Sequence, residues 1–460
     1  MKKKFLALIC ILLTSCSFAQ KSFEQKVDEL LEEPIRRNRY HGSLLVMQQD
    51  QIVMAKGYGY ANPEHKIKNQ TDTVFRIGSV TKQFTAMAIM ILKERGALTL
   101  DDTVGSYFPD FKKAKDVTIK QLLTHSSGIT NYTELPFYLE IIRLPQKKKN
   151  LIERLHSYPL LFVPGETTSY SNSNYLLLTA IIEKTAKISY EDFLEKEILK
   201  KLKMNSTGID NHLKLIPNRA LGLSLNDQKI VPADFIDVSV ANGAGAMYST
   251  VHDLSTWYKA IRDHKLISPQ TTEEMLTPFK HGFASGWFVA NRHGGKRVSH
   301  SGGINGFEAQ ISFYPETDSL VVVLSNIEHS VTGDLTKKLE EGLLKDQFEP
   351  FEFLDEVPLN LEEAKRVLGT YILNEDLQLK ITLEEGKLYA QATNQPKIQI
   401  FQAGENLYFL NIIDAKIKFV FNENNEKLSL NSHHSSHLLL RLDAVEFSYY
   451  CSPWRQRSPT

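Results

Sequence analysis

Strand-like patterns stand at both ends of the first 345 residues, and helical patterns lie between them. Residues 42–47 and 51–55 flank a short polar turn, which predicts a β-hairpin. From about residue 117 to 204 helical patterns alternate with Pro and Gly, and strand patterns return at residues 308–314 and 319–325, before a final helix. This order predicts an α/β (α+β) fold in which both ends share one mixed sheet flanked by helices, and the middle forms a helical domain.

Two helices are predicted near the start of this sheet. Residues 23–37 show apolar positions at helical spacing. Residues 83–93 are apolar nearly all round, so this second helix should be buried rather than lie on the surface.

The composition and periodicity of the sequence change after residue 346. Residues 347–360 are acidic, contain Pro and lack periodicity, so they are predicted to be a linker between the domain at residues 20–346 and a second domain. Residues 361–442 hold short alternating runs with turn signals, which predicts a small all-β barrel or a sandwich. Its strand-like runs are residues 377–383, 387–390, 398–401, 407–412, 416–421 and 438–442. Residues 443–460 fit no element and are expected to be irregular.

The N-terminus predicts export. Three lysines at positions 2–4 precede an apolar run over residues 5–13, which is typical of a signal peptide and too short to span a bilayer. Two processing sites compete. Small residues at positions 17 and 19 predict cleavage after residue 19, whereas Leu13-Thr-Ser-Cys16 resembles a lipobox in which Cys16 would carry a lipid anchor. The chain is therefore expected to be periplasmic or secreted, or a lipoprotein held at the membrane through Cys16.

Composition argues against several classes of partner. The formal net charge is zero, which disfavours a broad footprint for nucleic acid. No later segment has the length and apolarity of a transmembrane helix. At most two of the three cysteines remain after the signal peptide is removed, which disfavours a disulfide framework. There is no His-Glu-x-x-His motif and no Gly-rich phosphate loop, so we expect neither a metal nor a cofactor.

Ser79-Val-Thr-Lys82 appears once in the chain, at a predicted helix start. Three residues make nearly one helical turn, so the two side chains share a face. A serine hydroxyl is a poor nucleophile until a neighbour takes its proton, and an amine can do so or can supply favourable charge. The alternative is a helix-capping serine beside a surface lysine.

Tyr170-Ser171-Asn172 is a second polar triplet, placed before an apolar helix. An ammonium such as Lys82 next to the phenol would stabilise the phenolate, which could then act as general base toward Ser79. The alternative is a tyrosine that packs in a turn, with Asn172 as a helix cap.

His300-Ser301-Gly302-Gly303 is the third element and opens the strand region. Glycine lets a strand lie against a substrate because it has no Cβ. The backbone N–H groups of Gly303 and Ser79 could then form an oxyanion hole. The alternative for His300 is a histidine satisfied within the strand.

These three elements occur in order with two further motifs, Leu122-Leu-Thr-His-Ser-Ser-Gly128 and Gly243-Ala-Gly-Ala-Met-Tyr-Ser249. Together they resemble the class C β-lactamases and the related penicillin-binding serine hydrolases, over about residues 40–344. The resemblance implies a β-lactamase/transpeptidase-like fold with Ser79 as nucleophile and with Lys82 and Tyr170 as its activators. It also implies that Asn172 contacts substrate and lysine. The segment after about residue 361 is similar, more weakly, to a lipocalin-like barrel.

The resemblance implies an exported, cofactor-free serine hydrolase that forms an acyl-enzyme with esters, small amides or D-amino-acid peptides, including fragments of peptidoglycan. A β-lactamase or a D,D-carboxypeptidase is one alternative, and a non-catalytic protein that binds penicillins or cell-wall peptides is another. Class C β-lactamases usually carry lysine at the position of His300. An unperturbed histidine would begin to gain charge below about pH 6.5, so we expect a weak β-lactamase whose substrate preference depends on pH.

Overall fold

The computed structural model describes residues 21–226, 229–372, 378–393, 397–410, 415–419 and 421. The predicted signal peptide, the lipobox cysteine Cys16, the strand at 438–442 and the tail at 443–460 lie outside these residues, so the statements about them stay predictions. Among the described residues, no helix has both the length and the apolarity needed to cross a membrane.

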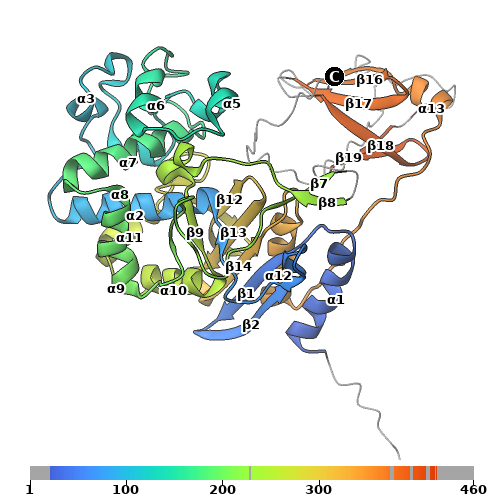
Figure 1. Ribbon diagram of the computed structural model, residues 1–460, viewed down its shortest axis with the longest axis horizontal. Helices are drawn as coiled ribbons and strands as arrows, with labels where there is room; N and C mark the ends of the chain where they lie inside the picture. The colour runs from blue at the N-terminus through green and yellow to red at the C-terminus, as the bar shows by residue number, and fades with distance from the viewer. Residues whose placement is uncertain are drawn as a thin grey trace, which may run out of the picture.

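A seven-stranded sheet forms the centre of the larger domain (Figure 1). Both ends of the domain contribute to it, as the order of patterns predicts, because β1 pairs with β14. The sheet was expected to be mixed, but every pairing in it is antiparallel, since most neighbours follow each other along the chain. Its strands, in order across the sheet, are β10 (Phe283–Ala284), β11 (Trp287–Arg292), β12 (Gly295–Ile304), β13 (Phe307–Tyr314), β14 (Ser319–Ser325), β1 (Gly42–Gln48) and β2 (Gln51–Tyr58).

Helices cover both faces of this sheet, so its central strands are apolar on both sides. In β1, Leu44 and Val46 point to one face, which is covered by α1 (Phe23–Arg36) and α12 (Thr332–Lys345). Leu45 and Met47 point to the other face, which packs on α2 (Thr81–Glu94) and α10 (Val251–Arg262). Helix α2 is buried from Thr81 to Leu92, which confirms that the predicted apolar helix is internal.

The middle of the chain forms a helical region beside the sheet (Figure 1). Its centre is α7 (Asn172–Ala186), which packs against α2, and ten of its residues are buried. The other helices of this region are short: α3 (Val104–Tyr107), α4 (Ile119–Leu123), α5 (Phe137–Ile141), α6 (Lys148–Leu155), α8 (Tyr190–Leu194) and α9 (Lys200–Leu202). A further short helix, α11 (Pro269–Leu276), packs on α2.

Three small sheets connect the loops. The first, with β5 (Phe75–Arg76), β9 (Met247–Ser249) and β6 (Gly208–Ile209), leads the chain into residue 79. The others pair β3 (Tyr60–Asn62) with β4 (Ile67–Lys68), and β7 (Leu223–Asn226) with β8 (Lys229–Pro232).

The C-terminal part is a curled antiparallel half-barrel with its own core around Ile381, Leu388 and Tyr408. It begins with α13 (Leu361–Arg366), and its six strands agree with most of the predicted runs. They are β15 (Gly369–Ile372), β16 (Gln378–Glu384), β17 (Lys387–Ala392), β18 (Ile398–Gly404), β19 (Leu407–Leu410) and β20 (Ala415–Lys418).

Residues 347–360 contain no helix or strand, but they are anchored at both ends. Phe348, Phe351 and Phe353 pack against the core beneath α1 and α12. At the other end, the backbone N–H of Val357 donates to the carbonyl of Gln402.

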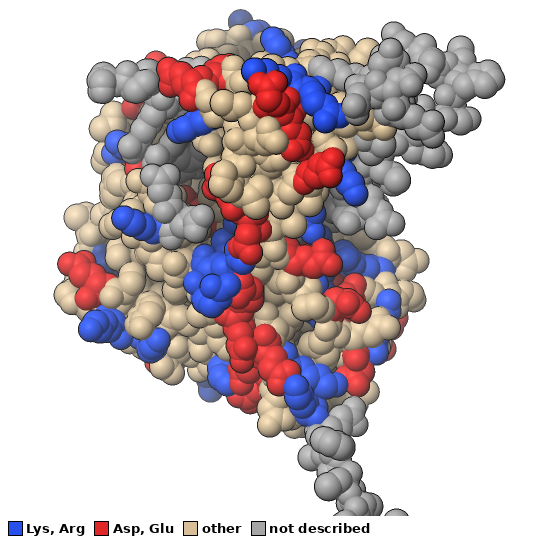
Figure 2. All heavy atoms as spheres, turned by 90° about the vertical axis from the view of Figure 1, so that its right-hand side faces the viewer, with Lys and Arg blue, Asp and Glu red and all other residues tan. Residues whose placement is uncertain are grey.

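The surface beside this segment carries charges of both signs. Figure 2 shows Lys and Arg side chains next to Asp and Glu across this face. Lys56 lies 2.8 Å from Asp28, and Arg37 pairs with Glu33 and with Asp355, so neighbouring charges offset each other.

We predict that Phe348→Ala lowers the free energy of unfolding by about 1–2 kcal/mol, because the ring is partly buried on Phe23 and α12. Urea denaturation of the whole chain measures this change. Leu361→Ala, at a side chain that is 50% exposed, serves as the control and should stay within about 0.5 kcal/mol. Equal stability of the two variants would mean that residues 347–360 are a free linker.

Candidate active site

Ser79 lies in a single 3₁₀ turn, Gly78–Val80, between β5 and α2. Its position is fixed from both sides, since the N–H of Ile77 donates to the carbonyl of Met247 and α2 begins at Thr81. Ser79 is half-buried, and the helix has Val80 rather than Ser79 at its N-cap. The side chain therefore does not cap the helix, which removes the structural alternative for this serine.

Lys82 is completely buried, so it is not a surface lysine. Its Nζ forms three hydrogen bonds, to Ser79 Oγ at 3.0 Å, to Asn172 Oδ1 at 2.8 Å and to the carbonyl oxygen of Ala244 at 2.7 Å. An ammonium has three donors and no acceptor, so three oxygens can satisfy it completely. None of the three oxygens belongs to a carboxylate.

The amide of Asn172 is oriented by a chain of hydrogen bonds. Thr133 Oγ1 donates its one proton to Asn131 Oδ1, so it can only accept from Asn172 Nδ2. The amide oxygen of Asn172 must then face Lys82. Asn172 is thus held in the site and does not act as a helix cap.

Burial lowers the pKa of Lys82 well below its ordinary value. In the neutral amine, two N–H groups would still donate to the oxygens of Asn172 and Ala244, and the lone pair would face Ser79 Oγ. The same geometry therefore serves a lysine that donates to the serine and a lysine that takes its proton.

The Tyr170 ring lies over Lys82, with 4.8 Å from Nζ to the ring centroid. It stacks on the His125 imidazole at 4.5 Å, and the N–H of Ser171 donates to His125 Nδ1. His125 therefore fixes the plane of the tyrosine. Phe288 and His300, each with its centroid 6.4 Å from that of Tyr170, complete an aromatic wall.

Strand β12 meets the turn that carries Ser79. A Cβ on Gly302 would lie 2.0 Å from the carbonyl oxygen of Ile77 and 3.0 Å from the N of Ser79, so only glycine permits this approach. A Cβ on Gly78 would lie 2.8 Å from the N of Gly303. The backbone of Gly302 and Gly303 therefore lies against the turn that carries Ser79, which is the close approach that an oxyanion hole built from the N–H groups of Ser79 and Gly303 needs.

His300 is buried in β12, and its Nδ1 donates to the carbonyl of the half-buried Ser301 at 2.6 Å. Desolvation, with a smaller effect of the charge on Lys82, lowers the pKa of His300 to about 3. The expectation that this imidazole gains charge near pH 6.5 is therefore wrong. It assumed a solvated ring, whereas the ring lies against Phe288 and Tyr170.

Sequence reasoning missed several contributors. The carbonyl of Ala244 belongs to a motif that was noted, but nothing in the sequence says that this carbonyl reaches Lys82. Phe288 and Thr133 follow no motif. Among the described residues, no cluster of three or more His, Cys, Asp or Glu is placed to hold a metal ion.

A serine bonded to a buried lysine, beside the closely approaching backbone of Gly302 and Gly303, fits the site of a serine hydrolase. The family model described as Beta-lactamase matches residues 23–343, so the chain belongs to that family. This match also confirms the resemblance seen in the motifs.

Two relatives extend beyond the catalytic region. Penicillin-binding protein 4* of Bacillus subtilis is 27% identical over 427 residues, which are 86% of this chain and 94% of the relative. The octameric penicillin-binding protein homologue of Pyrococcus abyssi superposes with a TM-score of 0.64 at 26% identity, covering 87% of this chain and 96% of that chain.

A third structure shares the fold of the larger part. The D-amino acid amidase of Ochrobactrum anthropi, complexed with D-phenylalanine, superposes with a TM-score of 0.63 at 22% identity. The superposition covers 71% of this chain and all of the amidase, 100%.

Buried neutral histidines make stability depend on pH. The unfolded chain takes up a proton on each histidine near pH 6.5, while His300 stays neutral in the fold until about pH 3. The unfolded state then binds more protons, so the free energy of unfolding falls as pH falls below 6.5. His125 and His41 act in the same direction. Glu308 opposes them, because burial raises its pKa to about 7.

We predict that urea unfolding at pH 7 and pH 5 separates the effect of His300 from the others. Between these pH values the wild-type protein should lose about 2 kcal/mol more stability than His300→Gln, which cannot titrate. Parallel losses in the two proteins would show that His300 is not held neutral.

Proposed function

We propose that this protein is an acyl-transferring serine hydrolase that acts on esters, small amides or D-amino-acid peptides through a covalent intermediate on Ser79. The observation that carries the proposal is the hydrogen bond between Ser79 Oγ and the buried Lys82 Nζ, next to the close approach of the Gly303 backbone to the turn that carries Ser79.

In the acylation step, Ser79 Oγ attacks the substrate carbonyl carbon and forms the new C–O bond. The serine proton passes to the Lys82–Tyr170 pair, and the carbonyl oxygen becomes an oxyanion that the two backbone N–H groups stabilise. Amine with phenol and ammonium with phenolate hold the same number of protons, so the pair titrates as one unit. Collapse of the intermediate breaks the bond to the leaving group, which takes the proton from the pair.

Deacylation repeats these steps with water. The pair removes a proton from water, the resulting hydroxide attacks the acyl carbon, and Ser79 Oγ leaves and regains its proton. No other reactant is needed.

If Tyr170 donates the proton to the leaving group, its position determines where the leaving group of the substrate lies. A leaving group that receives its proton from Tyr170 must lie near Phe288 and His300, whose rings neighbour the Tyr170 ring. The leaving-group end is aromatic, and its histidine is neutral. A carboxylate there would be desolvated without a cation from residue 300. We therefore propose leaving groups without a free carboxylate, which places amidase, aminopeptidase or esterase activity ahead of D,D-carboxypeptidase or β-lactamase activity.

The names of the relatives support this range of substrates. One similar fold belongs to an amidase for D-amino acids, and the relatives that extend over the C-terminal part are penicillin-binding proteins or their homologues. A peptide derived from peptidoglycan is accordingly within the proposed substrate class.

We predict that Ser79→Ala abolishes covalent labelling by a fluorophosphonate probe, because it removes the attacking oxygen. Intact-protein mass spectrometry measures the label, and circular dichroism checks that the variant is folded. Ser126→Ala, at a buried serine elsewhere in the same domain, is the control and should label like the wild type. Labelling of the Ser79 variant with unchanged stoichiometry would contradict the assignment.

We predict that residue 300 selects against anionic substrates through its lack of charge. His300→Lys should raise kcat/KM for a cephalosporin relative to a neutral ester about five-fold at pH 7, which corresponds to a charge-pair term of about 1 kcal/mol. His300→Gln is the neutral control. In the wild type, titration of His300 should not alter this ratio between pH 5.5 and 8, because the pKa of His300 is about 3. Equal ratios in the lysine and glutamine variants would mean that residue 300 does not face the substrate.

A further inference from the structure

The shortest of the three hydrogen bonds that Lys82 Nζ donates is accepted by a backbone carbonyl. Ala244 O lies 2.7 Å from it, in the 3₁₀ turn Asn242–Ala244. A backbone carbonyl can serve as a fixed acceptor only if the surrounding turn is held in place. The groups that hold this turn therefore bear on the chemistry at Lys82.

Two buried threonines hold the residue next to Ala244. Thr85 Oγ1 donates to the carbonyl of Gly243 at 2.7 Å, and the N–H of Gly243 donates to Thr179 Oγ1 at 3.2 Å. The contact is so close that a Cβ on residue 243 would lie 2.2 Å from Thr179 Oγ1. Glycine is required at this position by the approach of the threonines.

The hydroxyl protons can be assigned one by one. Thr85 uses its only proton on Gly243, so in the 2.6 Å contact with Tyr190 the tyrosine hydroxyl must be the donor. Thr179 donates its proton to the carbonyl of Tyr175 at 2.6 Å and can only accept from Gly243. Each hydroxyl proton therefore has an acceptor.

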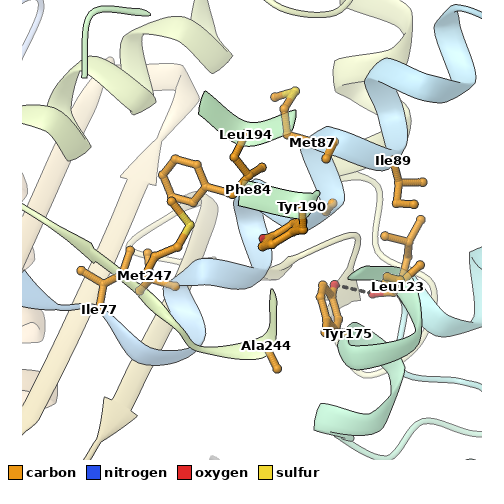
Figure 3. Close-up of a cluster of buried hydrophobic side chains, with 14 of the residues drawn as sticks. Ile77, Phe84, Met87, Ile89, Leu123, Tyr175, Tyr190, Leu194, Ala244 and Met247 are labelled. Carbon is orange, nitrogen blue, oxygen red and sulfur yellow. Dashed lines mark hydrogen bonds between the residues drawn. The ribbon is translucent and has the colours of Figure 1, made fainter. Parts of the chain in front are cut away.

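The arrangement connects the turn to the helix that carries Lys82. Thr85 lies three residues after Lys82 on α2, nearly one turn along the same face. Thr179 comes from α7 and Tyr190 from α8, and both are buried. Figure 3 shows the Tyr190 ring among Phe84, Met87 and Leu194, and it shows Ala244 on the adjoining loop.

We propose that Thr85, Thr179 and Tyr190 form a hydroxyl clamp, which keeps the Ala244 carbonyl on Lys82 and thereby sets the pH range in which the Lys82–Tyr170 pair is active. These are positioning residues, since they act through Ala244. The inference rests on the proposed function and names three further residues that support it.

The clamp can affect this pH range because the carbonyl dipole of Ala244 stabilises the ammonium form of Lys82 more than it stabilises the neutral amine. When the carbonyl moves away, burial of the ammonium is less well compensated, and loss of its proton becomes easier. The pair then loses its last proton at lower pH, and with it the ammonium charge that favours the phenolate and the attacking serine oxygen, so the basic limb of the activity profile moves down.

Other titratable groups around Lys82 do not ionise in this range. His300 on β12 and His125 before α7 are kept neutral by burial, which lowers the pKa of each. The pKa of Tyr175, whose ring centroid lies 5.5 Å from Lys82 Nζ, is raised by burial, and so is the pKa of Tyr190. Glu183, which accepts from the N–H of Tyr190, is the carboxylate beside the clamp.

The test measures the rate of fluorophosphonate labelling of the whole protein between pH 6 and 11. Thr85→Val keeps the shape of the side chain but removes the hydroxyl, and it should move the midpoint of the basic limb down by about half to one pH unit. Thr85→Ser restores the hydroxyl and should return the midpoint to the wild-type value. Thr336→Val is the matched control, because Thr336 is a buried threonine that also bonds a backbone carbonyl, on α12.

Tyr190→Phe is a second, milder variant, and it tests the clamp if Thr85→Val fails to fold. It removes only the hydroxyl that donates to Thr85 and should shift the limb in the same direction by a smaller amount. An unchanged limb in both folded variants, or an equal shift in Thr336→Val, would overturn the clamp. Absence of labelling in the wild type at every pH would overturn the proposed function and this inference with it.

Discussion

The buried Lys82 nitrogen needs a hydrogen-bond acceptor for each of its protons, and the layout of the site depends on meeting that need. Removing an ammonium from water costs several kcal/mol unless it is fully bonded. The three oxygens come from three elements: Ser79 from the turn before α2, Asn172 from the start of α7 and Ala244 from the turn at residues 242–244. The turn before α2, the start of α7 and the turn at residues 242–244 must therefore come together before the lysine is satisfied.

The choice of neutral oxygens has a chemical consequence. A carboxylate would hold the lysine permanently charged, whereas a hydroxyl, an amide and a carbonyl leave the ammonium and the amine closer in energy. The charge that remains is felt by the neighbouring histidines, because it lowers the pKa of His125 and of His300 in addition to the effect of burial. Apart from Lys82, the rings next to Tyr170 are those of Phe288 and of two histidines whose pKa is lowered, and we propose that this environment decides which leaving groups the site accepts.

The sequence predicted those features that follow from periodicity and from local motifs. The hairpin of β1 and β2, the buried helix α2 and the strands β13 and β14 come from apolar patterns that repeat with the period of each element. The three motifs supplied Ser79, Lys82, Tyr170, Asn172 and residues 300–303, which the structure brings together. The mixed sheet was not observed, because strand direction depends on long-range pairing rather than on local pattern.

Other features depend on contacts between distant residues. Nothing local shows that Ala244 bonds Lys82, which is 162 positions away, or that His300 is desolvated by Phe288. The pKa of a side chain depends on its burial and on its neighbours, and neither can be read from a motif. For the same reason, the packing of three phenylalanines in the predicted linker could not be anticipated from its acidic composition.

Rapid quenching of a D-aminoacyl ester reaction, followed by intact-protein and peptide mass spectrometry, tests the central claim most directly. The account predicts a transient adduct with the mass of the acyl group, located on the peptide that contains Ser79 and formed faster than the final product. Hydrolysis of the ester with no adduct at any time, or with the adduct on another residue, would contradict it, because water would then attack the substrate without an acyl-enzyme on Ser79.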